Sequence, residues 1–219
     1  MKALGLQGAR DDLHVLCVGA HCDDIEIGCA GALLKLQQDH PGLTCDWVVL
    51  TGNADRQAET QMAMRSLLKP AARGRLLFGG FPDASLPASY AGLKDFFKGL
   101  QKLRRPDLVF CHERHDAHQD HRIVNEMTWG AFRDHIILEY EIPKWDGGLT
   151  TPNVYVPLSA AQMRRKVSTL MKAFGSQRSR DWFAPQTFEA LMRLRGVESR
   201  ARSGYAEGFF ARKLTLFGS

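Results

Sequence analysis

The sequence predicts an α/β protein with a Rossmann-like, mostly parallel sheet flanked by helices on both faces. Short apolar runs recur at residues 13–20, 45–51, 75–79 and 107–111 of the 219-residue chain. Uninterrupted apolar runs of this length are typical of parallel strands that are buried on both faces. Longer stretches with helical periodicity separate these runs, and such alternation of strand and helix is typical of a parallel sheet.

The elements between the strands follow from local signals. Residues 30–36 present one apolar face, which predicts a first helix that ends where Pro41 and Gly42 interrupt it. A second helix near residues 62–68 is expected to stop before Pro70.

The turn-rich segment 79–87 predicts a loop over the carboxyl edge of the sheet. The remaining elements that we expect are helices at 92–104, 123–132, 160–173 and 185–199 and strands at 136–142, 154–158 and 209–217.

Length and composition favour one domain over residues 1–219, because 44% hydrophobic residues suffice for a full core. The elements that follow the turn residues 143–148 are too few in strands to fold alone and are expected to shape the substrate pocket. The chain has no apolar run of membrane-spanning length, and residues 1–10 do not resemble a secretory leader. We therefore expect a cytoplasmic protein that does not bind membranes.

Net charge and cysteine content further limit the functional classes to which the protein can belong. The net charge is +5, and residues 178–213 carry a surplus of basic side chains that could attract an anionic substrate. These basic residues lie among apolar ones at helical spacing, and the segment contains no recognised nucleic-acid-binding module. Both observations argue against nucleic-acid binding. The five cysteines form no Cys-x-x-Cys pair, so we expect reduced thiols.

Two polar clusters follow predicted strands. His21-Cys22-Asp23-Asp24 comes directly after the run 13–20, and His118-Gln119-Asp120-His121 follows the run 107–111. A catalytic zinc usually takes three protein ligands and leaves one position for water. Neither cluster alone supplies three, whereas His21, Asp24 and one downstream histidine do. Asp23 is then left over as a general base. Spacing alone does not select the downstream ligand, because histidines recur at positions 112, 115, 118 and 121.

The two polar clusters together resemble the sequence pattern of a known protein family. The pattern Ala20-His21-x-Asp23-Asp24-x-Glu26-x-Gly28, with the later Asp116-x-His118-x-Asp120-His121-Arg122, resembles the PIG-L/LmbE-like family of zinc-dependent N-acetyl amino sugar deacetylases. Similar features are Thr51-Gly52, Arg56-x-x-Glu59 and the segment 204–209. The chain departs from the family at Cys22, where proline is usual. The thiol could fill a small buried space or act as an extra ligand.

The resemblance implies roles for single residues. His121 would be the third metal ligand, for Zn²⁺ or another divalent ion. His118 would stabilise the oxyanion or protonate the leaving amine, with either Asp116 or Asp120 orienting its ring. The catalytic set is thus Asp23, His118 and Asp120. Arg56, Asp83 and Asp116 are candidate substrate contacts, although Arg56 could equally pair with Glu59 and Asp83 could cap a turn.

The implied function is removal of an acetyl group from an N-acetylated amino sugar or its conjugate, such as a sugar nucleotide. The alternative is a metal-free Rossmann enzyme that binds a nucleotide or S-adenosylmethionine, because Gly28 and Gly31 follow a strand. Their spacing departs from the dinucleotide fingerprint, and a histidine and two aspartates occupy the turn. The sequence leaves the oligomeric state open and is compatible with a homo-oligomer.

Overall fold

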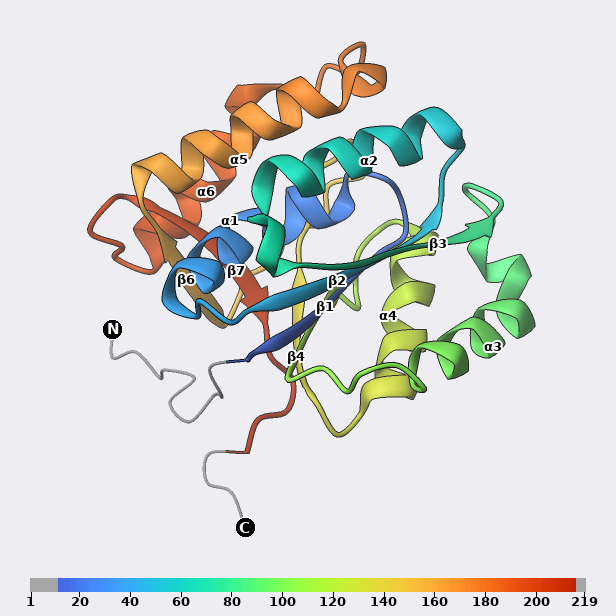
Figure 1. Ribbon diagram of the computed structural model, residues 1–219. Helices are drawn as coiled ribbons and strands as arrows, with labels where there is room; N and C mark the ends of the chain where they lie inside the picture. The colour runs from blue at the N-terminus through green and yellow to red at the C-terminus, as the bar shows by residue number, and fades with distance from the viewer. Residues whose placement is uncertain (1–11, 216–219) are drawn as a thin grey trace.

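A seven-stranded sheet forms the centre of the protein in the computed structural model, which describes residues 12–215 (Figure 1). Its strands lie in the order β3 (Arg73–Phe81), β2 (Thr44–Thr51), β1 (His14–Gly19), β4 (Leu108–His112), β5 (Ile136–Tyr140), β7 (Tyr205–Phe210) and β6 (Val154–Leu158). Strands β1 to β5 pair in parallel, and only β7 runs antiparallel to its two neighbours, β5 and β6. The predicted mostly parallel α/β sheet is confirmed.

Helices cover both faces of this sheet (Figure 1). On one face lie α1 (Asp24–Asp39), α2 (Ala54–Leu67), α5 (Ala160–Ala173) and α6 (Pro185–Glu198), which pack on one another and on a large apolar core. On the other face α3 (Tyr90–Leu100) and α4 (Gln119–Phe132) cover a second apolar core. Three short 3₁₀ helices are η1 (Pro70–Ala72), η2 (Leu86–Ser89) and η3 (Gly175–Gln177). Within residues 12–215 no helix combines the length and apolarity needed to cross a membrane.

The predicted elements are present, but several of their ends are shifted. Helix α2 begins at Ala54 rather than near 62, and α3 ends at Leu100 rather than at 104. Helix α4 starts at Gln119 rather than at 123, because the His118 side chain caps it and its first turn is polar. Strand β3 continues through Phe81, so the expected loop starts later. The last strand covers 205–210 instead of 209–217, since the charge of Glu207 masks an otherwise buried strand. Residues 216 and 217 of that expectation, and the leader expectation for residues 1–10, lie outside the described part.

The chain order places a crevice above β1 and β4. From β1 the sheet grows outward through β2 to β3, and from β4 it grows in the opposite direction to β5. Loops that leave two adjacent parallel strands toward opposite sides open a crevice at their carboxyl ends, where α/β proteins bind ligands. Both polar clusters predicted from the sequence follow these two strands.

A buried ion pair fixes α1 against the last strand. Glu207 accepts the backbone N–H groups of Gly31 and Ala32 at 2.8 and 2.7 Å, and its carboxylate lies 2.6 Å from Lys166 Nζ. Lys166 also donates to the carbonyl of Ile27 at 2.5 Å. Gly31 is required here, because a Cβ would meet the Glu207 carboxylate. The glycines of α1 thus serve close packing.

Candidate metal and catalytic site

The first polar cluster forms a tight turn between β1 and α1. The Asp24 carboxylate accepts the backbone N–H of His21 at 2.7 Å, which closes the turn. Asp23 has a φ of 134°, a region that residues other than glycine rarely adopt. Strain of this kind is concentrated at functional sites, where the surrounding structure holds it in place.

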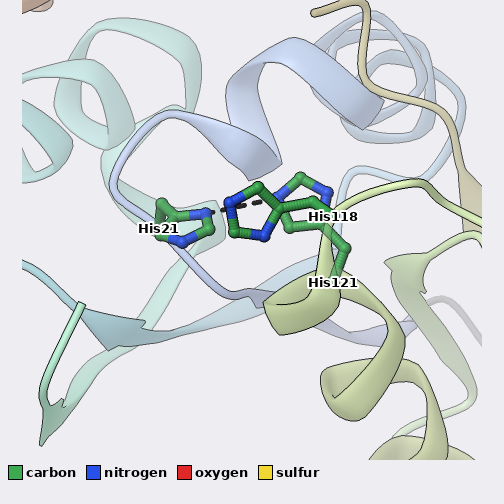
Figure 2. Close-up of side chains that lie close together, drawn as sticks. All are labelled: His21, His118 and His121. Atoms are coloured by element: carbon green, nitrogen blue, oxygen red, sulfur yellow. Dashed lines mark hydrogen bonds between the residues drawn. The ribbon is translucent and has the colours of Figure 1, made fainter. Parts of the chain in front are cut away.

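Three predicted ligand residues converge at this turn. His21 Nδ1 lies 3.2 Å from His121 Nε2 and 3.3 Å from one Asp24 oxygen, and His121 Nε2 lies 3.5 Å from the other Asp24 oxygen. Figure 2 shows the imidazoles of His21 and His121 directed toward one another, with His118 beside them. Ligands at about 2.0–2.1 Å from a tetrahedral zinc stand about 3.3 Å apart, so these separations fit such an ion.

Two further histidines lie within ligand range. His118 groups with His21 and His121, and His112 groups with Asp24 and His121. However, His112 Nε2 already accepts the backbone N–H of Ala20 at 3.0 Å. His118 Nδ1 accepts the backbone N–H of Asp120 at 3.2 Å, which leaves its Nε2 as the ring nitrogen that could bind an ion. His121 thus groups with His21 and His118 or with Asp24 and His112, and His21, Asp24 and His121, at 3.2–3.5 Å from one another, form a further candidate ligand set.

The charges of Asp24 and His121 suit a cation. Burial lowers the pKa of His21, but Asp24, Asp120 and Asp83 raise it well above its usual value, so His21 would have to release a proton to bind a metal. Burial opposes ionisation of Asp24, yet the imidazoles of His121, His112 and His21 hold the pKa of its carboxyl well below the usual range. Burial and His112 lower the pKa of His121 to about 3, so its imidazole is neutral at pH 7 and keeps a lone pair for a metal.

Asp23 lies beside the ligand set without belonging to it. Its carboxylate is buried and lies 3.1 Å from Arg56 Nη2. Burial raises the pKa of Asp23 to about 7, against the opposing effect of Arg56. Glu59 is 3.9 Å from Arg56, so of the two pairings Asp23 is the closer one. A carboxyl group with a pKa near 7 is suited to accept and return a proton.

Asp116 and Asp120 lie behind the histidines. Asp116 Oδ2 is 3.0 Å from His121 Nδ1 and 2.7 Å from Lys144 Nζ. Asp120 is fully buried, with one oxygen 3.3 Å from His21 Nε2 and the other accepting the backbone N–H of Leu86. The expectation that one of these carboxylates orients the His118 ring is corrected. Asp116 Oδ2 and Asp120 Oδ2 face His121 and His21, and Asp116 Oδ1 accepts the backbone N–H of His118 at 2.7 Å. The His118 ring is held by the Asp120 backbone instead.

The site opens into a cavity of about 750 Å³. Arg56 and Asp83 line it, and Asp83 lies 3.3 Å from His21 Nε2, whereas Asp116 is buried and contacts Lys144 and His121. Sequence reasoning missed several lining side chains that come from the last third of the chain. These are Lys144, Trp145, Gln177, Arg180 and Trp182. The turn cluster 143–148 was the one available signal.

The structure also shows the role of Cys22, which lies in the turn between β1 and α1. The Cys22 thiol is buried, donates to the Thr51 carbonyl at 3.4 Å and has a pKa raised by burial to about 11. Within residues 12–215, Cys22 belongs to none of the groups of side chains that could hold a metal ion.

The same turn argues against the metal-free alternative. Side chains already accept the backbone N–H groups of Ala20 and His21, so these groups are not free to bind a cofactor phosphate as that alternative would require.

Comparisons with known proteins agree with this geometry. A family model described as PIG-L, GlcNAc-PI de-N-acetylase, matches residues 16–132, which contain both polar clusters. The "uncharacterized deacetylase YaiS" of Escherichia coli K12 is 29% identical over 184 residues, which cover 76% of this chain and 94% of that protein.

Two solved structures show the same fold. The N,N'-diacetylchitobiose deacetylase from Pyrococcus horikoshii superposes with a TM-score of 0.73 at 22% identity, over 97% of this chain and 91% of that one. GalB, the 4-carboxy-2-hydroxymuconate hydratase of Pseudomonas putida KT2440, gives 0.70 at 15% identity, over 94% and 99%. One fold thus carries different reactions, and the reaction must be argued from the site.

Proposed function

We propose that this protein, which belongs to the PIG-L family of de-N-acetylases, hydrolyses the acetamido group of an N-acetylated amino sugar or its conjugate with the help of a divalent metal ion. The observation that carries the proposal is the convergence of His21, Asp24 and His121, with the Asp23 carboxylate beside them. Three ligands and an adjacent base are the minimal set for metal-assisted hydrolysis.

His21, Asp24 and His121 would hold the ion, for which zinc is our first choice because two imidazoles and one carboxylate suit it. A bound zinc supplies a Lewis acid for the amide carbonyl and lowers the pKa of water to about 7. The protein holds these ligands in place before binding, through Asp120 behind His21 and Asp116 behind His121. We therefore assign Asp116 as a positioning residue rather than a substrate contact, and Asp120 as a positioning residue rather than a catalytic one.

Asp23 would take the proton of the attacking water. Arg56 favours the ionised form of Asp23 while burial disfavours it, and the balance leaves the pKa of the carboxyl near neutrality. A base with such a pKa is about half ionised at pH 7 and largely ionised at pH 8, and it can still return the proton to a leaving amine. Arg56 would thus have two roles, because it would contact the substrate and also favour the ionised form of Asp23.

His118 would donate a hydrogen bond to the developing oxyanion or to the leaving nitrogen. Its Nδ1 accepts the backbone N–H of Asp120, so the neutral ring carries its hydrogen on Nε2. Burial lowers the pKa of His118, which keeps this neutral tautomer dominant at pH 7. A fixed donor aimed at the position where charge develops is worth about 10²- to 10³-fold in rate.

The cavity sets the size of the substrate. Its volume of about 750 Å³ lies within the range of sites that enclose drug-sized ligands. An acetamido sugar would leave room toward Trp145 and Trp182, which favours a conjugate such as a glycoside or a sugar nucleotide. Arg56 and Asp83 at the rim are the side chains that we assign to substrate contacts.

The test is acetate release by the metal-loaded protein. The purified chain is stripped with a chelator, reconstituted with one equivalent of Zn²⁺ and assayed with a panel of acetamido sugars, their glycosides and their nucleotide conjugates. We expect equal amounts of acetate and primary amine from at least one of them, and loss of both in Asp23→Asn. Absence of acetate across the panel, or an unchanged rate in Asp23→Asn, would refute the proposal.

A further inference from the structure

A second cavity of about 680 Å³ lies on the α4 side of the sheet, next to the loop that carries Asp116 and His118. It is nearly as large as the cavity at the candidate metal site, which we call the metal pocket, and residues of α4, η2, the loop after β4 and the segment after β7 line it. Nothing in the deacetylation argued above uses it. The loop 113–118 therefore has the metal pocket on one side and this basic cavity on the other.

The walls of the basic cavity carry mostly positive charge. Its cationic side chains are Arg114, Arg122, Arg212 and Lys213, and its carboxylate is Glu126, which accepts a hydrogen bond from Tyr90 at 3.1 Å. The metal pocket has a mixed lining, with the aspartates Asp23, Asp24, Asp83 and Asp146 and the cations Arg56, Lys144 and Arg180. A concave surface with charge of one sign focuses its potential and concentrates ions of the opposite sign. The basic cavity therefore favours an anionic ligand.

Several cationic donors in the basic cavity remain available. Arg122 Nη1 donates to the carbonyls of Asp116 and Ala117 at 2.8 and 2.5 Å, which positions the guanidinium without neutralising it. Arg212 uses Nε and Nη2 on Glu139 and Glu113, which leaves Nη1. Among the described residues, the Arg114 guanidinium has no carboxylate partner. Guanidinium groups bind phosphate through paired donors.

An aromatic side chain is fixed beside these cations. The half-buried Trp129 donates its indole N–H to Glu139 at 2.6 Å, and Arg212 Nε binds the same carboxylate oxygen at 2.6 Å. Glu139 is fully buried, so it holds both side chains in one place. An indole next to guanidinium groups is a platform on which a planar base can stack.

We propose that the basic cavity is a binding site for a nucleotide, with the phosphates on Arg114, Arg122 and Lys213 and the base on Trp129. The site is separate from the metal pocket and is in contact with the loop that shapes it. Arg122 would bind the phosphate with its free donors while it holds the carbonyls of Asp116 and Ala117. Occupancy would therefore stiffen the loop that carries His118.

The experiment is calorimetric titration of the full-length, zinc-loaded protein with ADP, pyrophosphate and adenosine. ADP should bind with an affinity that falls as salt is added, pyrophosphate more weakly because it lacks a base, and adenosine without detectable heat. The double variant Arg114→Gln, Lys213→Gln should weaken ADP binding about tenfold or more, since each change removes a charge-assisted contact. Binding is measured directly, so the result does not depend on deacetylase activity.

Two controls locate the ligand. Arg164→Gln with Lys172→Gln removes the same charge from the exposed side of α5, across the sheet, and should leave affinity within about twofold. Arg180→Gln removes a cation of the metal pocket. Unchanged ADP affinity in the Arg114, Lys213 variant would overturn the proposal, and so would a loss confined to Arg180→Gln. Equal affinities for ADP and pyrophosphate would overturn the role given to Trp129.

Discussion

Lys144 and Asp116 form an ion pair directly behind the imidazole of His121. Lys144 Nζ lies 2.7 Å from Asp116 Oδ2, and the same oxygen lies 3.0 Å from His121 Nδ1. Despite burial, His121 and Lys144 hold the pKa of Asp116 well below its usual range, so the group is a carboxylate. A carboxylate on the far nitrogen of a ligand histidine orients the ring and raises its basicity toward a metal.

We therefore expect Asp116→Asn to weaken zinc binding about 10- to 100-fold. The substitution keeps the size of the side chain and removes the charge that His121 faces. Competition with a chromophoric chelator measures the zinc dissociation constant. Asp146→Asn is the matched control, because Asp146 is an exposed aspartate of the same cavity. Equal affinities in wild type and Asp116→Asn would show that Asp116 does not support the ligand.

The division between metal ligands and base gives a second prediction. His21→Ala and His121→Ala should each lower bound zinc to a small fraction of an equivalent, because each removes one of three ligands. Asp23→Asn should retain zinc and lose about 10²- to 10⁴-fold in turnover, the range of a lost general base. Metal content by atomic emission and acetate release are measured on the same samples. Equal metal loss in all three variants would contradict the assignment.

His118 is expected to act mainly on turnover. Because its interaction strengthens only as charge develops on the substrate, His118→Ala should lower kcat by about 10²-fold or more while KM changes little. His115→Ala is the control, since His115 is an exposed histidine of the same loop. Steady-state kinetics, with the substrate of the panel that releases acetate fastest, measure kcat and KM of both variants. An effect on KM alone would assign His118 to uniform substrate binding.

The sheet and the two polar clusters could be predicted because their signals are local. The runs 13–20 and 107–111 are apolar without alternation, and each is followed directly by its polar cluster. Adjacent parallel strands bring their carboxyl ends together, so two separate clusters become one site once β1 and β4 pair. The resemblance to the PIG-L family supplied the choice of His121 among four equally spaced histidines.

The second layer of the site could not be predicted, because it depends on which backbone groups and rings meet in space. Asp116 and Asp120 both flank His118 in sequence, yet the loop turns their carboxylates to His121 and His21. His112 ends a strand and stacks on His121 at 3.8 Å between ring centroids, a contact that no sequence spacing specifies. Lys144 reaches Asp116 from a loop after β5.

The buried pair Lys166–Glu207 yields a prediction on stability. Both side chains are about 4% exposed or less, and Glu207 also binds two N–H groups of α1. Glu207→Gln leaves Lys166 buried without its counter-charge, so we expect a loss of about 3–5 kcal/mol in the free energy of unfolding. Denaturant titration measures it.

The exposed pair Lys35–Asp39, with a separation of 2.7 Å, is the control for this variant. Asp39→Asn should cost less than about 1 kcal/mol, because surface ion pairs contribute little. Similar losses in the two variants would mean that burial does not distinguish the two pairs.

Glu26 provides a prediction on the pH dependence of stability. Its side chain is buried on α1, and neither carboxyl oxygen has a hydrogen-bond partner among the described residues. Burial, with Asp23 and Asp24 adding to it, raises the pKa of Glu26 well above the ordinary value of 4.5. The folded protein therefore holds a proton that the unfolded chain releases above pH 4.5. Because the folded state binds more protons, the contribution of Glu26 to stability is complete below this pH and declines as pH rises toward the folded pKa.

Glu26→Gln replaces the protonated carboxyl by a neutral group of the same size and removes this decline. The variant should match the wild type near pH 4.5 and exceed its stability at pH 8, with a difference that grows by up to about 1.4 kcal/mol per pH unit. Unfolding in urea at pH 5, 6, 7 and 8, with a chelator present, measures the difference, in which the titration of all other groups cancels. A difference that stays constant with pH would mean that Glu26 has the same pKa in the folded and unfolded states. A variant that is less stable than the wild type at pH 8 would mean that the folded protein stabilises the Glu26 carboxylate, contrary to the effect expected from its burial.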